Sequence, residues 1–409
     1  MPNILTLDDH SFKGKTVLVR VDFNSPIDPE TKRILEDVRI RAHGETTLKE
    51  LADMGAKIVV LAHQGRPGEA DFIPLKEHAE ILGRILRKPV SYVDDLFGEK
   101  AKKRIKALEN GEIIVLQNVR AYKEERKKAT PEEHAETEFV RSLSPLADTF
   151  VNDAFAAAHR AHVSIVGFTA VLPSFAGRIM ERELTALSKA LEAPEKPCTY
   201  ILGGAKADDA LRISKFVLDN KIADNILAGG VAGHLFLLAK GIELGKPNKE
   251  FLEKKELLSY VPGIRELTER FPHEIKTPRD IAVDVNGKRK EIGTKDLPTD
   301  FPISDIGTET IHEYGEIIKD SKSIVISGPL GIFENKEFAK GTKEILEAVA
   351  ESQGFSLVGG GHTVAAVEQL GLKTKMGYVS TAGGALIEFL MGEKLPGVEA
   401  LKTAASREH

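Results

Sequence analysis

Arginine and histidine side chains follow several apolar runs in the first half of the chain. They stand in Arg20-Val21-Asp22-Phe23-Asn24, His63-Gln64-Gly65-Arg66, Asn118-Val119-Arg120 and His159-Arg160-Ala161-His162, and Arg39 opens the helix expected after the first run. A lone arginine is more often a surface residue than a ligand. The carboxyl ends of parallel strands, however, meet at one edge of a sheet, and guanidinium groups bind phosphate and carboxylate through paired hydrogen bonds. Five such groups therefore predict an anion site.

Glycine replaces arginine at the equivalent places in the second half. The segments are Gly203-Gly204-Ala205-Lys206, Gly229-Gly230, Gly328-Pro329-Leu330-Gly331 and Gly359-Gly360-Gly361-His362-Thr363. Glycine lets the backbone approach a phosphate, and the first turn of a helix supplies amide donors to it. Tight turns in α/β proteins also need glycine, so each segment by itself is compatible with a simple turn.

Two familiar nucleotide-binding motifs do not fit. Gly14-Lys15-Thr16 resembles the end of a P-loop, but Asp9 stands where the first glycine belongs and the segment precedes a strand. Gly230 and Gly233 have the spacing of the dinucleotide motif, but Ala228 occupies its first glycine position. This argues against a P-loop enzyme and against a nicotinamide-dependent oxidoreductase.

Short apolar runs alternate with amphipathic segments along the whole chain. This alternation predicts an α/β protein with parallel sheets and crossover helices. The expected strands are 16–22, 57–62, 113–117 and 148–152, and then 199–202, 225–228, 281–285, 323–327, 356–358 and 377–380. The expected helices include 37–54, 75–86, 131–143, 180–191, 207–219 and 336–351. Thr130-Pro131-Glu132-Glu133 has the residues of a well-capped helix start.

A chain of 409 residues is too long for one ordinary core. We expect an N-terminal lobe at 1–175 and a C-terminal lobe at 176–392, both doubly wound and Rossmann-like. Hinges are expected near 176–190 and 380–385. The tail at 393–409 is expected to pack back on the first lobe.

Composition narrows the class of protein. The net charge of -5 argues against a nucleic-acid partner. Cys198, the single cysteine, excludes a disulfide framework and fits a reducing compartment. No apolar run is long enough for a membrane span, and the N-terminus lacks an apolar signal core. A cytoplasmic protein is therefore expected.

Taken in order, these segments resemble the signatures of the phosphoglycerate kinase family, in its archaeal branch. The matching segments are 20–24, 63–67, 151–155 with 158–162, 203–206, 328–334, 359–363 and 380–385. The resemblance implies two hinged lobes and a reversible phosphoryl transfer between 1,3-bisphosphoglycerate and ADP, giving 3-phosphoglycerate and ATP. It also implies Mg²⁺ as cofactor and a place in glycolysis and gluconeogenesis.

The resemblance also assigns roles to residues of this chain. Those implied to bind phosphoglycerate are Asp22, Phe23, Asn24, Arg39, His63, Gln64, Gly65, Arg66, Arg120 and Arg160. Those implied to serve the nucleotide are Gly203, Lys206, Glu334, Gly360, Gly361, His362 and Thr363. Arg39, Lys206 and the amides of Gly360 and Gly361 would stabilise the transferring group. A carboxylate nucleophile is already ionised at neutral pH and needs no general base, so His63, His159 and His162 are interpreted as hydrogen-bond donors.

Three positions depart from the common family pattern. Ala210 stands where many members carry a second lysine, and either Lys206 suffices or Arg212 or Lys215 replaces it. His362 replaces an aspartate that helps to place the magnesium nucleotide, and imidazole is a poor ligand for Mg²⁺. Ile326-Ser327 stands where a tryptophan is common. The metal ligands, the preferred nucleotide and the choice between monomer and homodimer stay open. A non-catalytic relative would have lost Arg39 or Lys206, and both are present.

Overall fold

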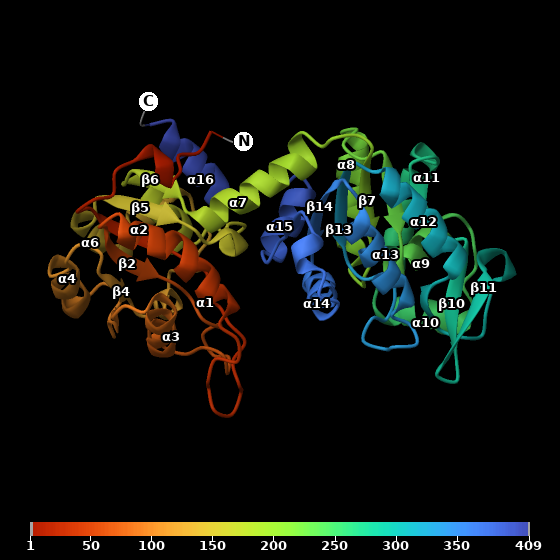
Figure 1. The fold of residues 1–409 in the computed structure, drawn as a ribbon, viewed down its shortest axis with the longest axis horizontal. Coiled ribbons are helices and arrows are strands. Elements are labelled where there is room, and N and C mark those ends of the chain that lie inside the picture. Colours follow the sequence, from red (N-terminus) through yellow and green to blue (C-terminus); the bar gives the residue numbers. More distant parts are fainter. Residues whose placement is uncertain (1–2, 408–409) are drawn as a thin grey trace. The chain divides into compact units, whose positions relative to one another are not determined.

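The computed structural model describes residues 3–407, which divide into two compact units (Figure 1). Unit 1 holds the chain up to Thr185 and again from Lys394, and unit 2 holds Ala186–Glu393. The chain therefore passes from one unit to the other twice. No helix within residues 3–407 has the length and apolar character needed to cross a membrane.

Six parallel strands form the sheet of unit 1 within the described residues, in the order β3-β4-β2-β1-β5-β6. The strands are β1 (Thr16–Arg20), β2 (Lys57–Leu61), β3 (Val90–Tyr92), β4 (Ile113–Val115), β5 (Thr149–Asn152) and β6 (Ser174–Ala176). Sequence order reverses around β1, so the carboxyl ends of β4, β2, β1 and β5 lie next to one another. This is the edge where a doubly wound sheet binds its ligand.

Helices cover both faces of this sheet. The helices of unit 1 are α1 (Val38–His43), α2 (Lys49–Asp53), α3 (Lys76–Leu86), α4 (Glu99–Lys106), α5 (Pro131–Ala135), α6 (Glu138–Leu143), α16 (Pro396–Ala405) and most of α7 (Arg178–Leu187). Val17 and Val19 of β1 belong to a core with α1–α3, whereas Leu18 between them belongs to a core with α4 and α6. Apolar residues on both faces explain why β1 reads as a continuous apolar run.

Unit 2 repeats the architecture with a second six-stranded parallel sheet, in the order β15-β14-β13-β7-β8-β9. The strands are β7 (Cys198–Leu202), β8 (Asn225–Ala228), β9 (Ile275–Lys276), β13 (Ser323–Ser327), β14 (Phe355–Gly359) and β15 (Tyr378–Val379). The helices are α8 (Ala207–Asp219), α9 (Gly230–Ala239), α10 (Lys246–Lys254), α11 (Val261–Arg270), α12 (Thr308–Asp320), α13 (Lys340–Glu351), α14 (Gly361–Gln369) and α15 (Gly384–Leu390). The predicted fold class, two doubly wound α/β lobes, is confirmed.

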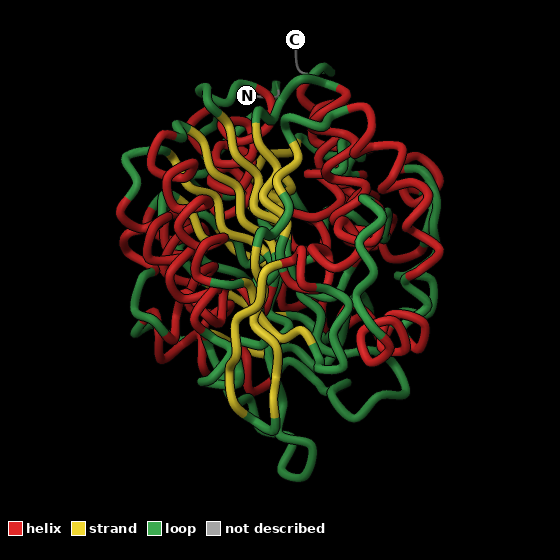
Figure 2. Tube along the Cα trace, turned by 90° about the vertical axis from the view of Figure 1, so that its right-hand side faces the viewer, coloured by secondary structure: helices red, strands yellow, loops and turns green. Residues whose placement is uncertain are grey.

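One strand prediction is wrong in its sheet. Residues 281–285 were expected in the second parallel sheet, but β10 (Asp280–Val285) pairs antiparallel with β11 (Lys288–Gly293) and β12 (Ile303–Ile306). Figure 2 shows the β10–β11 hairpin as two long neighbouring strands. Asn286 and Gly287 turn the chain with φ of 56° and 83°. Asn-Gly is the strongest short hairpin signal, but the prediction of the second sheet did not take it into account.

Several element boundaries also differ from expectation. The helix expected over 37–54 is continuous but contains a π-helical stretch, Gly44–Leu48, between α1 and α2. The helix expected over 131–143 is two helices, because Thr137 caps a new start at α6. The predicted cap at Thr130 is confirmed, with its hydroxyl accepting from the Glu133 amide at 3.2 Å. Strands β3, β6 and β9 were not predicted, because strands of two or three residues are too short to show a periodic pattern.

Candidate functional site

The carboxyl edge of the unit 1 sheet carries a cluster of buried and half-buried cations. Arg20 ends β1 and is 1% exposed, and Arg120 follows β4 and is 7% exposed. The Arg20 Nη2 lies 3.0 Å from the His63 Nδ1, and its Nε donates to the Ser164 hydroxyl at 2.8 Å. Arg120 donates through Nη1 to the Gly65 carbonyl. We use the name basic cluster for seven residues: Arg20, Arg39, Arg120, Arg160, His63, His159 and His162.

Two buried nitrogen atoms of the basic cluster lack a protein partner among the described residues. They are the Nε of Arg120 and the Nδ1 of His159. Buried polar atoms in folded proteins are almost always hydrogen-bonded. Donors left open beside several guanidinium groups fit an anionic ligand that completes the site.

Asp22 is the carboxylate that organises the exposed side of this cluster. Its side chain is buried, and Arg39 from α1 pairs with its Oδ2. Burial alone would raise the pKa of Asp22, but Arg39 above all holds it down at about 2. Asp22 is therefore ionised and fixes Arg39, whose side chain remains 37% exposed and free to meet a ligand.

The histidines of the basic cluster are neutral at pH 7. Burial, with Arg20 nearby, lowers the pKa of His63 well below its usual range. Burial and then Arg160 lower the pKa of His159 to about 4 and that of His162 to about 3. Neutral rings among arginines serve as hydrogen-bonding groups, because a proton taken from a substrate would be strongly disfavoured there.

Glu125 lies beneath the basic cluster and was not found by sequence reasoning. Its side chain is fully buried and accepts from the Ser164 hydroxyl at 2.6 Å and the Ser164 amide at 2.9 Å. Burial raises its pKa to about 7, although Arg20 and Ser164 oppose the shift. In Lys123-Glu124-Glu125-Arg126 it resembles any surface charge, and no local signal separates it from its neighbours.

Not every expected residue presents its side chain to the cluster. Phe23 is fully buried in the core, and Gln64 is fully buried with its amide bonded to the Ser25 backbone. Asn24 accepts from the Gly65 amide at 2.9 Å and so joins the loops after β1 and β2. Arg66 is exposed. The structure thus brings Asp22, Arg39, His63, Arg120 and Arg160 together and gives Phe23, Asn24, Gln64 and Gly65 supporting places around them.

In unit 2 the glycine loops pack against one another. The Gly203 amide donates to the Ser327 carbonyl at 2.9 Å, and the Gly204 amide donates to the Pro329 carbonyl at 2.7 Å. A Cβ on Gly203 would lie 2.2 Å from the Pro329 oxygen, whereas a Cβ on Gly361 would meet nothing within 4 Å. Gly203 is therefore required by loop packing, and Gly361 leaves open space at the start of α14.

A pocket of about 480 Å³ opens above these loops. Gly203, Gly204 and Lys206 line it together with Gly360 and Gly361. Lys206 precedes α8, its side chain is 84% exposed, and its Nζ lies 3.8 Å from the Asp209 carboxylate. The N-termini of α8 and α14 and one exposed ammonium suit a chain of phosphates. Thr363 is fully buried and accepts from the Gly328 amide at 2.8 Å, so its hydroxyl fixes the loops.

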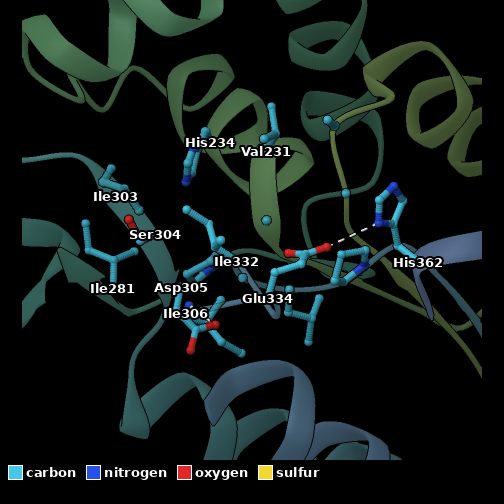
Figure 3. A pocket seen from close by; sticks show the side chains of 17 residues that line it. Val231, His234, Ile281, Ile303, Ser304, Asp305, Ile306, Ile332, Glu334 and His362 are labelled. Atoms are coloured by element: carbon cyan, nitrogen blue, oxygen red, sulfur yellow. Dashed lines mark hydrogen bonds and ion pairs between the residues drawn. The ribbon is translucent and has the colours of Figure 1, made fainter. Parts of the chain in front are cut away.

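A second pocket, of about 220 Å³, adjoins the first through Gly204, Pro329 and His362 (Figure 3). Val231 and His234 of α9 face Ile303, Ile306 and Ile332 across it. Glu334 lies at its rim, 3.3 Å from the His362 Nδ1, and both side chains are exposed. Apolar walls with Glu334 at the rim suit a flat base and a ribose hydroxyl, and the second carboxylate of the lining, Asp305, is buried and paired with Arg289. Sequence reasoning missed these walls because they come from three distant segments without a shared motif.

The described residues contain no group of three or more His, Cys, Asp or Glu side chains that could hold a metal ion. Asp209 is the carboxylate that lines the larger pocket. Mg²⁺ commonly binds one or two carboxylates and completes its shell with substrate phosphates and water. The residues present fit a magnesium that arrives with a nucleotide.

Two doubly wound units, one with an arginine cluster suited to an anion and one with a pocket suited to phosphates, fit an α/β phosphotransferase. The family model for phosphoglycerate kinase matches residues 7–393. The chain belongs to the phosphoglycerate kinase family. It is 48% identical to the phosphoglycerate kinase of Methanothermus fervidus over 402 residues, covering 98% of both chains. It is 50% identical to that of Methanobacterium bryantii over 396 residues, covering 97% and 96%.

Solved structures agree with this assignment. The crystal structure of phosphoglycerate kinase from Pyrococcus horikoshii OT3 superimposes with a TM-score of 0.89 at 41% identity, covering 99% of this chain and 100% of that one. The structure from Coxiella burnetii gives 0.86 at 31% identity, covering 98% and 100%. The enzyme transfers a phosphoryl group between 1,3-bisphosphoglycerate and ADP in glycolysis. In the reverse direction, from ATP, the acceptor is the carboxyl group of 3-phosphoglycerate.

Proposed function

We propose that unit 1 binds the phosphoglycerate and unit 2 binds the nucleotide. The observation that carries this assignment is the partition of charge: buried arginines at the edge of one sheet and open glycine loops with Lys206 at the edge of the other. Asp22, Arg39, His63, Arg120 and Arg160 contact the phosphoglycerate, with Arg66 at the exposed rim. Phe23, Asn24, Gln64 and Gly65 hold the loops that carry them.

In unit 2 the phosphates bind beside Lys206 and the amides of Gly360 and Gly361, and the base enters the apolar pocket. Glu334 accepts from a ribose hydroxyl, with His362 beside it. Gly203 and Thr363 keep the loops in place through the contacts described above. Mg²⁺ would be held mainly by the phosphates and water, with Asp209 as the carboxylate on the pocket wall, and when bound it would neutralise charge on the transferring group.

Chemistry in this arrangement consists of alignment and charge neutralisation. In the direction from ATP, the ionised carboxylate of 3-phosphoglycerate attacks the γ-phosphorus as the bond to the ADP oxygen breaks. Arg39 orients the carboxylate, and Lys206 with the Gly360 and Gly361 amides offsets charge on the phosphoryl oxygens. Since separate units hold the two substrates, transfer requires a relative movement of the units, and we place its hinges near 176–190 and 380–385. Expelling water during that movement protects the acyl phosphate.

We further propose a cytoplasmic enzyme, supported by the free, buried thiol of Cys198. A single chain carries both substrate sites, so either a monomer or a homodimer is compatible.

The experiment is a substrate-specific kinetic test of Lys206→Met. We expect the KM for ATP to rise and turnover to fall by roughly 10²-fold, with the KM for 3-phosphoglycerate unchanged. Lys215→Met is the matched control, because Lys215 lies on α8 outside the pocket lining and pairs with Asp219 on the surface. A selective loss of phosphoglycerate affinity in Lys206→Met would overturn the division between the units.

A further inference from the structure

Helix α1 contacts Asp22 through two of its side chains. Arg39 on α1 pairs with the Asp22 carboxylate, and His43, one turn later, accepts the Asp22 backbone N–H at Nε2 over 3.2 Å. Residues four apart lie on the same face of a helix. The side chain and the backbone of Asp22 are therefore both held by α1.

The other nitrogen of the same ring faces a buried carboxylate. The His43 Nδ1 lies 2.6 Å from the Oδ2 of Asp153, and both side chains are buried. Asp153 directly follows β5, in the segment that sequence reasoning took for the end of a ligand-binding strand. Its Oδ1 accepts from the amides of Ile179 at 2.8 Å and Met180 at 3.3 Å. A buried anion at the first turn of α7 is well placed for that helix.

These contacts determine the protonation of His43. A ring nitrogen that accepts a backbone N–H carries no proton, so Nε2 is bare and the proton lies on Nδ1. The Nδ1–H then donates to Asp153. The space around Asp153 is closed, because a Cβ on Gly177 would lie 2.3 Å from its Oδ1. The carboxylate consequently has little freedom to leave the ring.

We propose that His43 is a positioning residue for the phosphoglycerate site. As the neutral Nδ1–H tautomer it joins the Asp22 backbone to Asp153 and, through Asp153, to the first turn of α7. The inference rests on the proposed assignment of Asp22 and Arg39 to phosphoglycerate. His43 acts through Asp22, whose backbone it holds so that the carboxylate presents Arg39 to the ligand.

Three replacements at position 43 separate the two hydrogen bonds. His43→Ala removes both, His43→Gln keeps an acceptor near the place of Nε2, and His43→Asn keeps a donor near the place of Nδ1. We expect His43→Ala to raise the KM for 3-phosphoglycerate about fivefold, the effect of one net hydrogen bond, while the KM for ATP stays constant. His43→Gln restores the KM to within about twofold of the parent, and His43→Asn does not.

Equal changes in the KM values of both substrates, or rescue by His43→Asn alone, would overturn the proposal. Nitrogen-15 NMR of the parent enzyme tests it without a variant: the proton must be found on Nδ1 of His43 at pH 7, and an Nε2–H tautomer refutes the chain of bonds. Arg39→Ala distinguishes the two levels of inference. If Arg39→Ala leaves the KM for 3-phosphoglycerate unchanged, the site assignment fails. If Arg39→Ala raises this KM but His43→Ala does not, only the role of His43 fails.

Discussion

Replacing Arg39 by alanine removes the ion pair that holds Asp22 ionised. The pKa of Asp22 lies at about 2 against an ordinary 3.8. At about 1.36 kcal/mol for each pH unit, the ionised carboxylate contributes on the order of 2 kcal/mol. Arg39 is the largest favourable contributor, so we expect Arg39→Ala to lower the free energy of unfolding at pH 7 by about 2 kcal/mol. Urea unfolding measures this loss.

The pH dependence of that loss has a definite sign. A depressed carboxyl pKa contributes stability that is present above the unfolded value near 3.8 and disappears as the pH falls through about 2. The difference between parent and Arg39→Ala is therefore constant from pH 7 to about 5 and narrows below pH 4. A difference that stayed constant down to pH 2.5 would refute the electrostatic account.

Catalysis suffers more than stability. Charge-assisted hydrogen bonds contribute about 1.5–3 kcal/mol each, and losing two of them from the transition state lowers turnover by roughly 10²-fold or more. A coupled assay of ATP formation from 1,3-bisphosphoglycerate gives the turnover, and titration calorimetry gives the ADP affinity, which we expect to stay the same. Arg41→Ala is the control, because Arg41 is half exposed and pairs with Asp37 and Glu45 along its own helix. Surface pairs of this kind contribute little. An equal loss of ADP affinity in Arg39→Ala, or an equal loss of turnover in Arg41→Ala, would show that the reasoning is wrong.

Three further outcomes follow from the same structure. Gly203→Ala forces a Cβ to 2.2 Å from the Pro329 oxygen, so thermal unfolding should show a loss of about 1–3 kcal/mol together with weaker ADP binding. Gly361→Ala meets nothing within 4 Å of the chain, and calorimetry should show weaker nucleotide binding with unchanged stability; a matching loss of stability would contradict the open space there. Because the pKa of Glu125 lies at about 7, its ionisation above that pH weakens the positive field of the basic cluster, and the KM for 3-phosphoglycerate should rise as the pH passes 7 in the parent but not in Glu125→Gln. His162→Gln should keep this inflection, since the pKa of His162 is about 3. If the inflection disappears in His162→Gln, the titrating group is not Glu125.

Sequence reasoning found the strand ends that carry the chemistry because apolar runs and the residues after them are local signals. Asp22, Arg39 and Lys206 were identified in this way, and the structure places each at the carboxyl edge of its sheet. The direction of a side chain is a different kind of information. Asp153 and Gln64 stand at strand ends too, yet both turn inward and bond to backbone, because burial there depends on helices distant in sequence.

The small antiparallel sheet and the apolar pocket show two different reasons for incomplete prediction. Asn286-Gly287 was a usable turn signal. The strand before it was assigned to the wrong sheet and the strand after it was not predicted, because the alternation of the chain as a whole dominated the interpretation. The pocket walls at Val231, Ile303 and Ile332 had no signal. Each is an ordinary apolar residue whose meaning depends on the three-dimensional neighbourhood.

The double passage of the chain between the units has a consequence for biosynthesis. Helix α16 packs on β6 and on the turns at 163–170, and its Ala400 joins a small core with Ala154, Ala157, Ile165 and Val166. Unit 2 lies wholly within Ala186–Glu393, whereas unit 1 needs residues from both ends of the chain. In the order of synthesis, unit 2 therefore has all its residues before unit 1 does. Unit 1, which begins first, is completed only after unit 2, when α16 has been synthesised and covers the apolar residues Ala154, Ala157, Ile165 and Val166.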